Sequence, residues 1–198
     1  MKQKKQIYSI LMYIAIGILV VWGFYQTKVD GGKPFPIQID DVTIIPGETT
    51  MGDLLEQGVE MYASTSNPLE PAEITGAEEL GANTEAYMIY GIPKKLKTKV
   101  NDKAFYCTVV NTSDKAKEIK DCVVNSVSVY FKDMEELKCT LLIDGKEYNE
   151  GMKAELEAEH KKYFNDYDDR YAVKYDHYKL EFDSGDDGKI SSVQSSWK

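Results

Sequence analysis

The longest run of hydrophobic residues lies near the N-terminus. Residues 7–25, IYSILMYIAIGILVVWGFY, contain no charged side chain. A helix of this length is roughly 28 Å long, close to the ~30 Å hydrocarbon core of a bilayer. Lys2, Lys4 and Lys5 precede the run, and no acidic residue does. Because cytoplasmic flanks of membrane helices carry excess Lys and Arg, the pattern predicts a cytoplasmic tail over residues 1–6 and an extracytoplasmic remainder.

The end of this run bears on whether the segment is cleaved. A cleaved secretory signal has a shorter apolar region followed by small residues at the cleavage site. Here the run ends in Val21-Trp22-Gly23-Phe24-Tyr25, and no cysteine follows that could accept a lipid. We therefore expect an uncleaved, single-pass signal-anchor, with cleaved secretion and a buried core helix as the alternatives.

A short linker, strand and helix are expected next. Residues 26–41 are rich in Gly and Pro and are predicted to be the linker, and residues 42–45 are predicted to form a strand. In TMGDLLEQG, residues 50–58, Thr50 and Asp53 have the spacing of a capping box, and Gly58 suits the left-handed end of a short helix. The loop before this helix lacks the Gly-Lys-Ser/Thr of a phosphate-binding loop, so we interpret it as a helix start.

Alternation of apolar and polar residues then predicts an antiparallel meander after the loop-rich residues 63–86. The expected strands are 87–90, 95–100, 104–110 and 119–131. A second series follows, with a strand at 137–143, then a helix, then strands at 171–175, 178–183 and 190–194. The apolar face of the expected helix carries Met152, Leu156, His160 and Tyr163. The sequence DSGDDGK is expected to turn the last hairpin.

The two series give the predicted fold class, α+β, with two strand–helix–three-strand units over residues 42–131 and 137–194 and antiparallel sheets. One alternative stays open for the second unit. Tyr163, Tyr167, Tyr171 and Tyr175 are spaced by four, which would place them on one face of a single long helix over residues 149–175. The Asn and Asp residues at 165–169 are weak helix formers, which counts against the long helix.

The charge of the chain narrows the class of partner. The first 25 residues hold three basic residues and no acid, which leaves 21 Lys and Arg against 33 Asp and Glu in the body, a formal charge of −12. Such a body repels phosphate backbones, so we expect no nucleic-acid partner.

Three cysteines are candidates for a disulfide. A hairpin centred between residues 114 and 115 would place Cys107 directly opposite Cys122, within bonding distance. An extracytoplasmic compartment permits that bond. Pairing of Cys122 with Cys139, or no disulfide, are the alternatives, and Cys139 is expected to be the buried, unreactive cysteine in the first case.

The remaining candidate chemistry is sparse. His160 and His177 are the two histidines, too few for a typical catalytic zinc site, and we expect His160 to pack and His177 to be exposed. Residues 183–194 lack the glutamate that an EF-hand loop needs at its last position. The acids of NDYDDRY, 165–171, are interpreted as a solvated loop. No serine-hydrolase motif is present. We therefore predict no catalytic, cofactor or metal site and no enzymatic activity.

The turn glycine, the threonine-capped short helix and the following antiparallel sheet resemble the tandem domains of the beta-lactamase-inhibitor-protein type, which also occur in small outer-membrane assembly lipoproteins. The ending YKLEFDSGDDGKISSVQ is similar to the last hairpin of that family. The resemblance implies a helix packed on an antiparallel sheet, protein-binding surfaces and no catalysis. The chain departs from the family at Asn149-Glu150-Gly151-Met152, where a Gly-x-Thr helix start is expected.

These observations predict a membrane-anchored extracytoplasmic domain of a bacterial cell envelope that interacts, without catalysis, with another envelope protein. Two alternatives remain. One is an inhibitor of a secreted or envelope enzyme, as the resemblance allows. The other is a carbohydrate-binding or enzymatic domain whose site is built from dispersed residues, since fourteen tyrosines offer faces on which sugars can stack.

Overall fold

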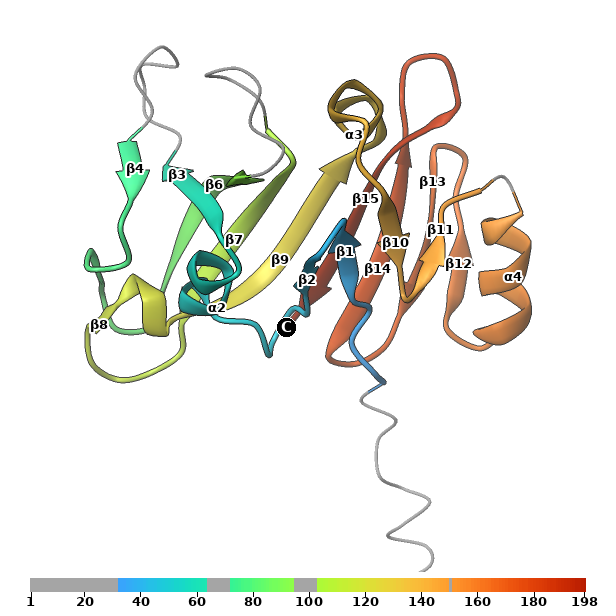
Figure 1. Ribbon diagram of the computed structural model, residues 1–198. Helices are drawn as coiled ribbons and strands as arrows, with labels where there is room; N and C mark the ends of the chain where they lie inside the picture. Colours follow the sequence, from blue (N-terminus) through green and yellow to red (C-terminus); the bar gives the residue numbers. More distant parts are fainter. Residues whose placement is uncertain (1–31, 64–71, 95–102, 150) are drawn as a thin grey trace, which may run out of the picture.

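The computed structural model describes residues 32–63, 72–94, 103–149 and 151–198. The expected membrane segment 7–25 and the alternating residues 95–100 lie outside these ranges. Within them, no helix is both long enough and apolar enough to cross a bilayer. The fold is α+β and largely β, with antiparallel sheets and a few short helices (Figure 1).

A nine-stranded antiparallel sheet forms the frame of the molecule. Its strands, in spatial order, are β12 (Phe164–Asp166), β13 (Arg170–Lys174), β14 (Tyr178–Ser184), β15 (Ile190–Trp197), β9 (Val123–Tyr130), β7 (Phe105–Asn111), β6 (Thr84–Pro93), β3 (Val59–Ala63) and β4 (Ala72–Ile74). The pairing of β9 with β15 joins strands from the two halves of the chain, with Val129 opposite Val193.

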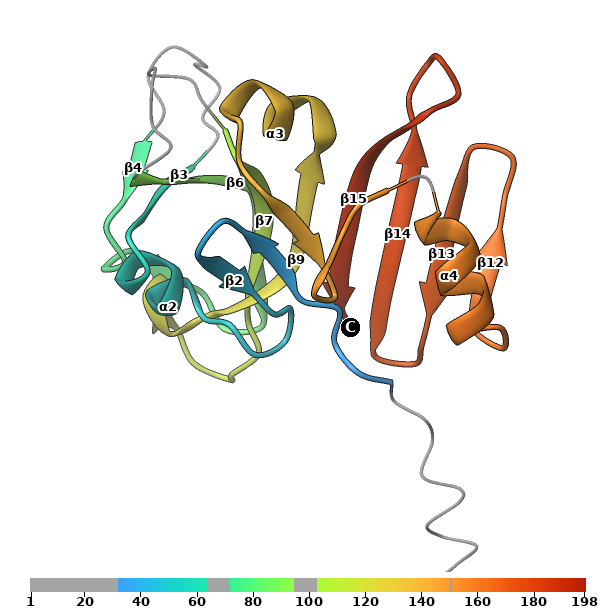
Figure 2. The same cartoon turned by 45° about the vertical axis from the view of Figure 1, so that its right-hand side comes forward.

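One face of this sheet is covered by a smaller sheet and by helices. The smaller sheet has the order β11 (Lys146–Glu147), β10 (Leu141–Ile143), β1 (Ile37–Ile39) and β2 (Val42–Ile44). The helices are α2 (Met51–Glu56), η2 (Ile119–Asp121), α3 (Phe131–Leu137) and α4 (Met152–Glu159), and β5 (Glu79–Leu80) pairs with β8 (Lys117–Glu118). Both views show the two hairpins, α2 and α4 on the same side of the large sheet (Figure 2).

The order of elements repeats along the chain. In each half a hairpin is followed by a helix and then by strands of the large sheet: β1-β2-α2-β3-β6-β7-β9, and β10-β11-α4-β12-β13-β14-β15. The smaller sheet is symmetric in strand order about the pair β1–β10, and the large sheet is symmetric about the pair β9–β15 once the additional edge strand β4 is set aside. The repetition therefore starts with a hairpin, one strand earlier than the sequence pattern indicates for the first half.

A single hydrophobic core fills the space between the two sheets. Along β7, residues alternate between buried and half-buried, as expected for a strand with one face on the core. The core-facing positions include Phe105 and Val109 in the first half and Phe182 and Val193 in the second, all at most 1% exposed. Because both halves contribute to the same core, the burial of each helix depends on the shared sheet.

Four details differ from the sequence-based expectations. Residues 37–39 of the expected linker form β1, because Ile37 and Ile39 are apolar and fully buried between β2 and β10. The strand expected over 119–131 is interrupted at its start by η2, and Phe131 already begins α3. The strand expected over 137–143 starts at Leu141, since Lys138 takes a left-handed conformation that ends α3.

The fourth difference concerns the alternative of a long helix over residues 149–175, which is wrong. The helix α4 ends at Glu159, so Tyr163 lies beyond the helix on whose face it was expected. The tyrosine-rich segment forms the hairpin β12–β13 instead. Asn165 and Asp166 lie in β12, consistent with their weak helix propensity.

The start of α2 confirms the capping-box prediction. The Thr50 hydroxyl accepts a hydrogen bond from the Asp53 backbone N–H at 3.1 Å, and the Asp53 carboxylate accepts from the Thr50 N–H at 2.7 Å. Just before it, Gly47 has φ +86° and its N–H donates to the Val124 carbonyl of β9 at 2.9 Å. The ring of Trp197 lies directly against Gly47, where an added Cβ would be 2.8 Å from the indole.

A pair of glycine substitutions tests this contact. We expect Gly47→Ala to lower the free energy of unfolding by about 2–4 kcal/mol, because alanine is strained at positive φ and its methyl group overlaps Trp197. Gly58→Ala is the matched control: Gly58 has φ +77° with no atom near an added Cβ, so it should cost only about 1–2 kcal/mol. Urea unfolding measures both. Equal losses would show that the Trp197 contact is unimportant.

His160 follows α4 and packs as predicted, at 8% exposure. The ring of Phe35 meets it edge-on at 5.7 Å, and its Nδ1 lies 2.8 Å from the Tyr175 hydroxyl. Its Nε2 is buried without a hydrogen-bond partner among the described residues, 3.8 Å from the Glu159 carboxylate. Burial lowers the pKa of His160, partly offset by Glu159 and Asp144, while Lys33 and Lys146 lower it further.

This burial predicts a pH-dependent stability. With a folded pKa below the unfolded value, His160 contributes stability that is fully present above pH ~6.5. This stability is lost as the pH falls from there through the folded pKa, because the unfolded chain then binds more protons. We expect His160→Leu to flatten the change in urea midpoint between pH 7.5 and 5. His177→Leu, on an exposed turn, should keep the wild-type slope. An unchanged slope in His160→Leu would contradict this assignment.

Candidate functional site

The structure does not bring the two predicted disulfide cysteines together. All three cysteines are free thiols. Cys107 is opposite Val127 in the register of β7 and β9. Val127 lies five residues after Cys122, which corresponds to roughly 16 Å along an extended strand. A disulfide requires Cα atoms within ~7 Å. The opposition of Cys107 and Cys122 was wrong because β8 and η2 occupy the connection and shift the centre of the hairpin.

The open face of the nine-stranded sheet carries a row of tyrosines, which we call the tyrosine row: Tyr62 on β3, Tyr90 on β6, Tyr106 on β7 and Tyr130 at the end of β9. Successive ring centroids are 5.4, 6.4 and 5.7 Å apart. Cross-strand register aligns the first three, since Tyr62 is opposite Tyr90 and Tyr90 is opposite Tyr106. Aromatic pairs across strands stabilise a sheet, and here they link the four rings into one row.

Exposure increases from Tyr90 to Tyr130, toward the centre of the sheet. Tyr90 is buried at 5%, Tyr106 is half-buried, and Tyr130 is 47% exposed. The ammonium of Lys103 lies 4.8 Å from the Tyr90 ring centroid and 5.4 Å from that of Tyr106. Beside Tyr106 and Tyr130 the surface is hollowed by about 460 Å³, with Ser128 and Gln194 among the small polar side chains that line it.

Beyond this hollow the same face becomes charged. Glu181 on β14 is only 6% exposed and forms an ion pair with Lys179, while its other oxygen is 3.9 Å from Arg170. Burial, together with the charge of Glu181, raises the pKa of Asp183 on the same strand. The open face is therefore aromatic over the first half of the chain and ionic over the second.

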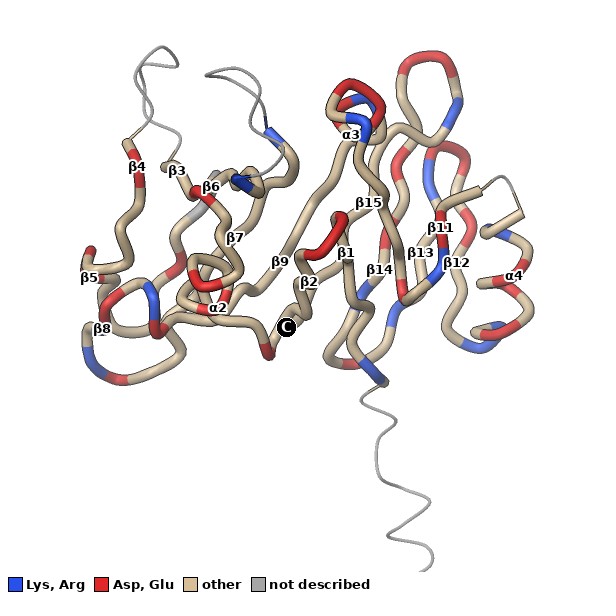
Figure 3. The backbone as a smooth tube through the Cα atoms, in the orientation of Figure 1, with Lys and Arg blue, Asp and Glu red and all other residues tan. Residues whose placement is uncertain are grey.

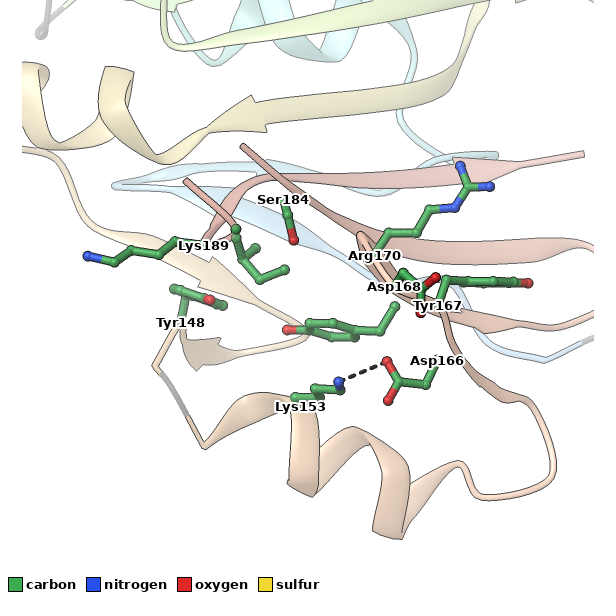
Figure 4. Close-up of a pocket in the computed structure, with 11 residues that line it drawn as sticks. Tyr148, Lys153, Asp166, Tyr167, Asp168, Arg170, Ser184 and Lys189 are labelled. Carbon is green, nitrogen blue, oxygen red and sulfur yellow. Dashed lines mark ion pairs between the residues drawn. The ribbon is translucent and has the colours of Figure 1, made fainter. Parts of the chain in front are cut away.

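A second hollow of about 490 Å³, which we call the α4 pocket, lies on the second half of the chain. It is formed where α4, the β12–β13 hairpin and the β14–β15 turn converge (Figure 4). Tyr171, 3% exposed, belongs to its lining and stacks on Phe182 at 4.5 Å. Tyr148 lies at another side and stacks on Phe131 at 4.3 Å. Burial raises the pKa of Tyr171, so its hydroxyl stays protonated at neutral pH.

Polar side chains also face this pocket. The Lys153 ammonium from α4 is 2.8 Å from the Asp166 carboxylate of β12, and Figure 4 shows Ser184 on the side away from this pair. In the same view the charged ends of Lys189 and Arg170 extend outward. Both partners of the ion pair are about half exposed, so they remain accessible to a ligand.

Charged residues of one sign are not concentrated around either hollow. Lys and Arg residues are interspersed with Asp and Glu over both halves of the described chain (Figure 3). Among the described residues, no group of three His, Cys, Asp or Glu is close enough to hold a metal ion. The acids of residues 165–171 were interpreted as a solvated loop, whereas Asp166 and Asp168 line the α4 pocket.

The chain was compared with known protein families, curated proteins and solved structures, and none of the three comparisons gave a match.

The cysteine environments make a direct prediction. Alkylation of the denatured, unreduced protein should modify three thiols, since all are free. In the native protein at pH 7.5 all should react slowly, because burial raises the pKa of Cys107 to about 12 and that of Cys139 to about 11. Cys139, which is half-buried, should react before the two fully buried thiols. A denatured count of one would show that a disulfide exists.

Proposed function

We propose that this chain is a membrane-anchored, non-catalytic binding domain of a bacterial cell envelope. In this proposal residues 7–25 span the membrane, the body is extracytoplasmic, and the tyrosine row contacts a second envelope protein. The observation that carries the proposal is this row, which ends in an exposed tyrosine beside a hollow on the open sheet face. Tyrosine is enriched in the energetically important centres of protein interfaces because it offers a large apolar area with a polar tip.

The position of the first described residues sets the orientation of such a domain. Phe35 is fully buried and its carbonyl accepts a hydrogen bond from the Ser195 hydroxyl at 2.7 Å, so the chain belongs to the fold from there on. Between the proposed anchor and residue 32 there are six residues, which span at most about 20 Å. The end of the domain near Lys33 is therefore held close to the bilayer.

This orientation places the candidate surfaces away from the membrane. In Figure 1 the start of the described chain, in blue, lies at the lower edge, whereas α3 and the β14–β15 turn lie at the upper edge. Tyr130 directly precedes α3, and Lys189 of that turn lines the α4 pocket. A protein partner approaching from outside the membrane would therefore reach the end of the tyrosine row at Tyr130.

The acidic charge of the body favours a protein as the partner rather than an anionic lipid surface. Its formal charge of −12 would repel lipid headgroups, whereas the stacked rings and Lys103 offer apolar and cation–π contacts to another protein. The paired residues Lys179 and Glu181 at the other end of the face would then contribute to specificity more than to affinity.

Photocrosslinking in intact cells tests this proposal. A benzophenone amino acid at position 130 of the full chain should capture one defined envelope protein. Tyr167 is the matched control position, since it is 41% exposed against 47% for Tyr130 but lies at the β12–β13 turn. Crosslinking from position 167 should not yield the same protein.

The captured partner then allows a quantitative check. Tyr106→Ala with Tyr130→Ala in the full chain should weaken binding to the purified partner by at least about tenfold, because truncating a central interface tyrosine costs more than about 1 kcal/mol. Undiminished binding by this double variant, or the same capture from both crosslinker positions, would contradict the proposed interface.

A further inference from the structure

The internal repeat allows the α4 pocket to be compared with the equivalent region of the first half. In each half, the connection between the last two strands passes the start of the helix. In the first half, the connection between β7 and β9 contains η2 and packs onto α2. The Met51 N–H donates to the Cys122 carbonyl at 3.0 Å, and an added Cβ on Gly52 would lie 3.0 Å from the Lys120 carbonyl oxygen. Ile119 of η2 joins the core at 6% exposure.

The second half leaves the corresponding space open. Its connection between β14 and β15 is a short turn over residues 185–189, closed by the Gly185 N–H donating to the Lys189 carbonyl at 2.8 Å. Lys153 is the second residue of α4, as Gly52 is of α2. Gly52 lies against the β7–β9 connection, whereas Figure 4 shows Lys153 and Lys189 of the β14–β15 turn on different sides of the α4 pocket. The pocket therefore occupies a position that the same fold can fill.

We propose that the α4 pocket binds one uncharged sugar residue of a glycan. Its polar groups suit hydroxyl groups, which donate and accept hydrogen bonds at once: the Asp166 carboxylate accepts, the Lys153 ammonium donates, and the Ser184 hydroxyl does both. Its volume of about 490 Å³ is within the range of small-ligand pockets.

The aromatic lining suits the apolar face of a sugar ring. Tyr148 and Tyr171 contribute rings to the pocket, and Ile190 contributes an aliphatic surface. Each ring is held in place by stacking, Tyr148 on Phe131 and Tyr171 on Phe182. Rings that are fixed before binding lose little side-chain entropy when a ligand is bound.

The charge balance favours an uncharged ligand over an anion. The ammonium of Lys153 is neutralised by Asp166 at 2.8 Å, and Asp168 adds a second carboxylate to the lining. The two other cations of the lining extend outward, and Arg170 lies over the Tyr167 ring at 5.2 Å. An anion would therefore meet an already paired lysine and a nearby carboxylate, whereas a hydroxyl pair can bridge both partners.

Saturation-transfer NMR on the full chain, solubilised in a detergent without a sugar headgroup, tests the site. The probes are the methyl glycosides of glucose, galactose and N-acetylglucosamine, with inorganic phosphate measured by ³¹P line broadening. We expect at least one glycoside to bind and phosphate not to. Asp166→Asn should weaken that glycoside at least tenfold, and Ser184→Leu, which fills the pocket, should abolish binding. Asp176→Asn, on the exposed β13–β14 turn, is the matched control and should bind within twofold of wild type.

Three results would overturn the proposal. One is that none of the glycosides binds. The second is unchanged glycoside binding by Asp166→Asn and Ser184→Leu, which would place the sugar elsewhere. The third is phosphate binding that becomes tighter in Asp166→Asn, which would identify an anion site. Circular dichroism spectra that match wild type ensure that a loss of binding in either variant reflects the pocket. This test does not involve the tyrosine row, so its failure and that of the proposed protein interface are distinguishable.

Discussion

The pairing of β9 with β15 is the interaction on which the rest of the structure depends. These strands come from different halves of the chain, and their ladder merges two meanders into one nine-stranded sheet. The pairing of β1 with β10 repeats this on the smaller sheet, with Ile37 opposite Ile143. The buried hydrogen bond from Ser195 to the Phe35 carbonyl ties the last strand to the start of the fold. Helices of six to eight residues are unstable alone, so α2 and α4 depend on the core that these pairings create.

The two halves share one order of elements but differ in the space beside the helix. The first half closes the space beside its helix with η2, whose backbone contacts the start of α2. The second half joins the equivalent strands by a short turn and leaves a polar, aromatic-lined pocket. The same order of elements therefore has the space beside the helix filled in the first half and open in the second. The open space can hold the proposed site without loss of the common core, because core packing elsewhere is continuous.

The open face of the nine-stranded sheet also differs between the two halves of the chain. One face of an antiparallel sheet can be solvated while the other is packed, and the alternation along β7 and β9 shows this division. Large tyrosine rings fill the aromatic half of the open face, and ion pairs occupy the other half. Stacking between neighbouring strands contributes to stability there, so Tyr106 serves both the sheet and the proposed interface.

Much of the local structure followed from the sequence. The capping pair Thr50 and Asp53, the hairpin turn after Ser184, the strands ending the chain and the packing role of His160 were all predicted, because each depends on neighbouring residues or on a periodic pattern. The sequence pattern also gave the largely antiparallel α+β character. Its expectation of a membrane segment over residues 7–25 lies outside the described residues and remains a prediction.

Tertiary structure alone decided the register and the sites. The opposition of Cys107 and Cys122 failed because the register of a hairpin depends on how its connection packs, and η2 is held by α2, far back in the sequence. The α4 pocket likewise joins Lys153, Asp166 and Ser184 from three separate elements. Local patterns report which face a residue occupies, but the distance between residues on different elements is set by the packing of the whole core.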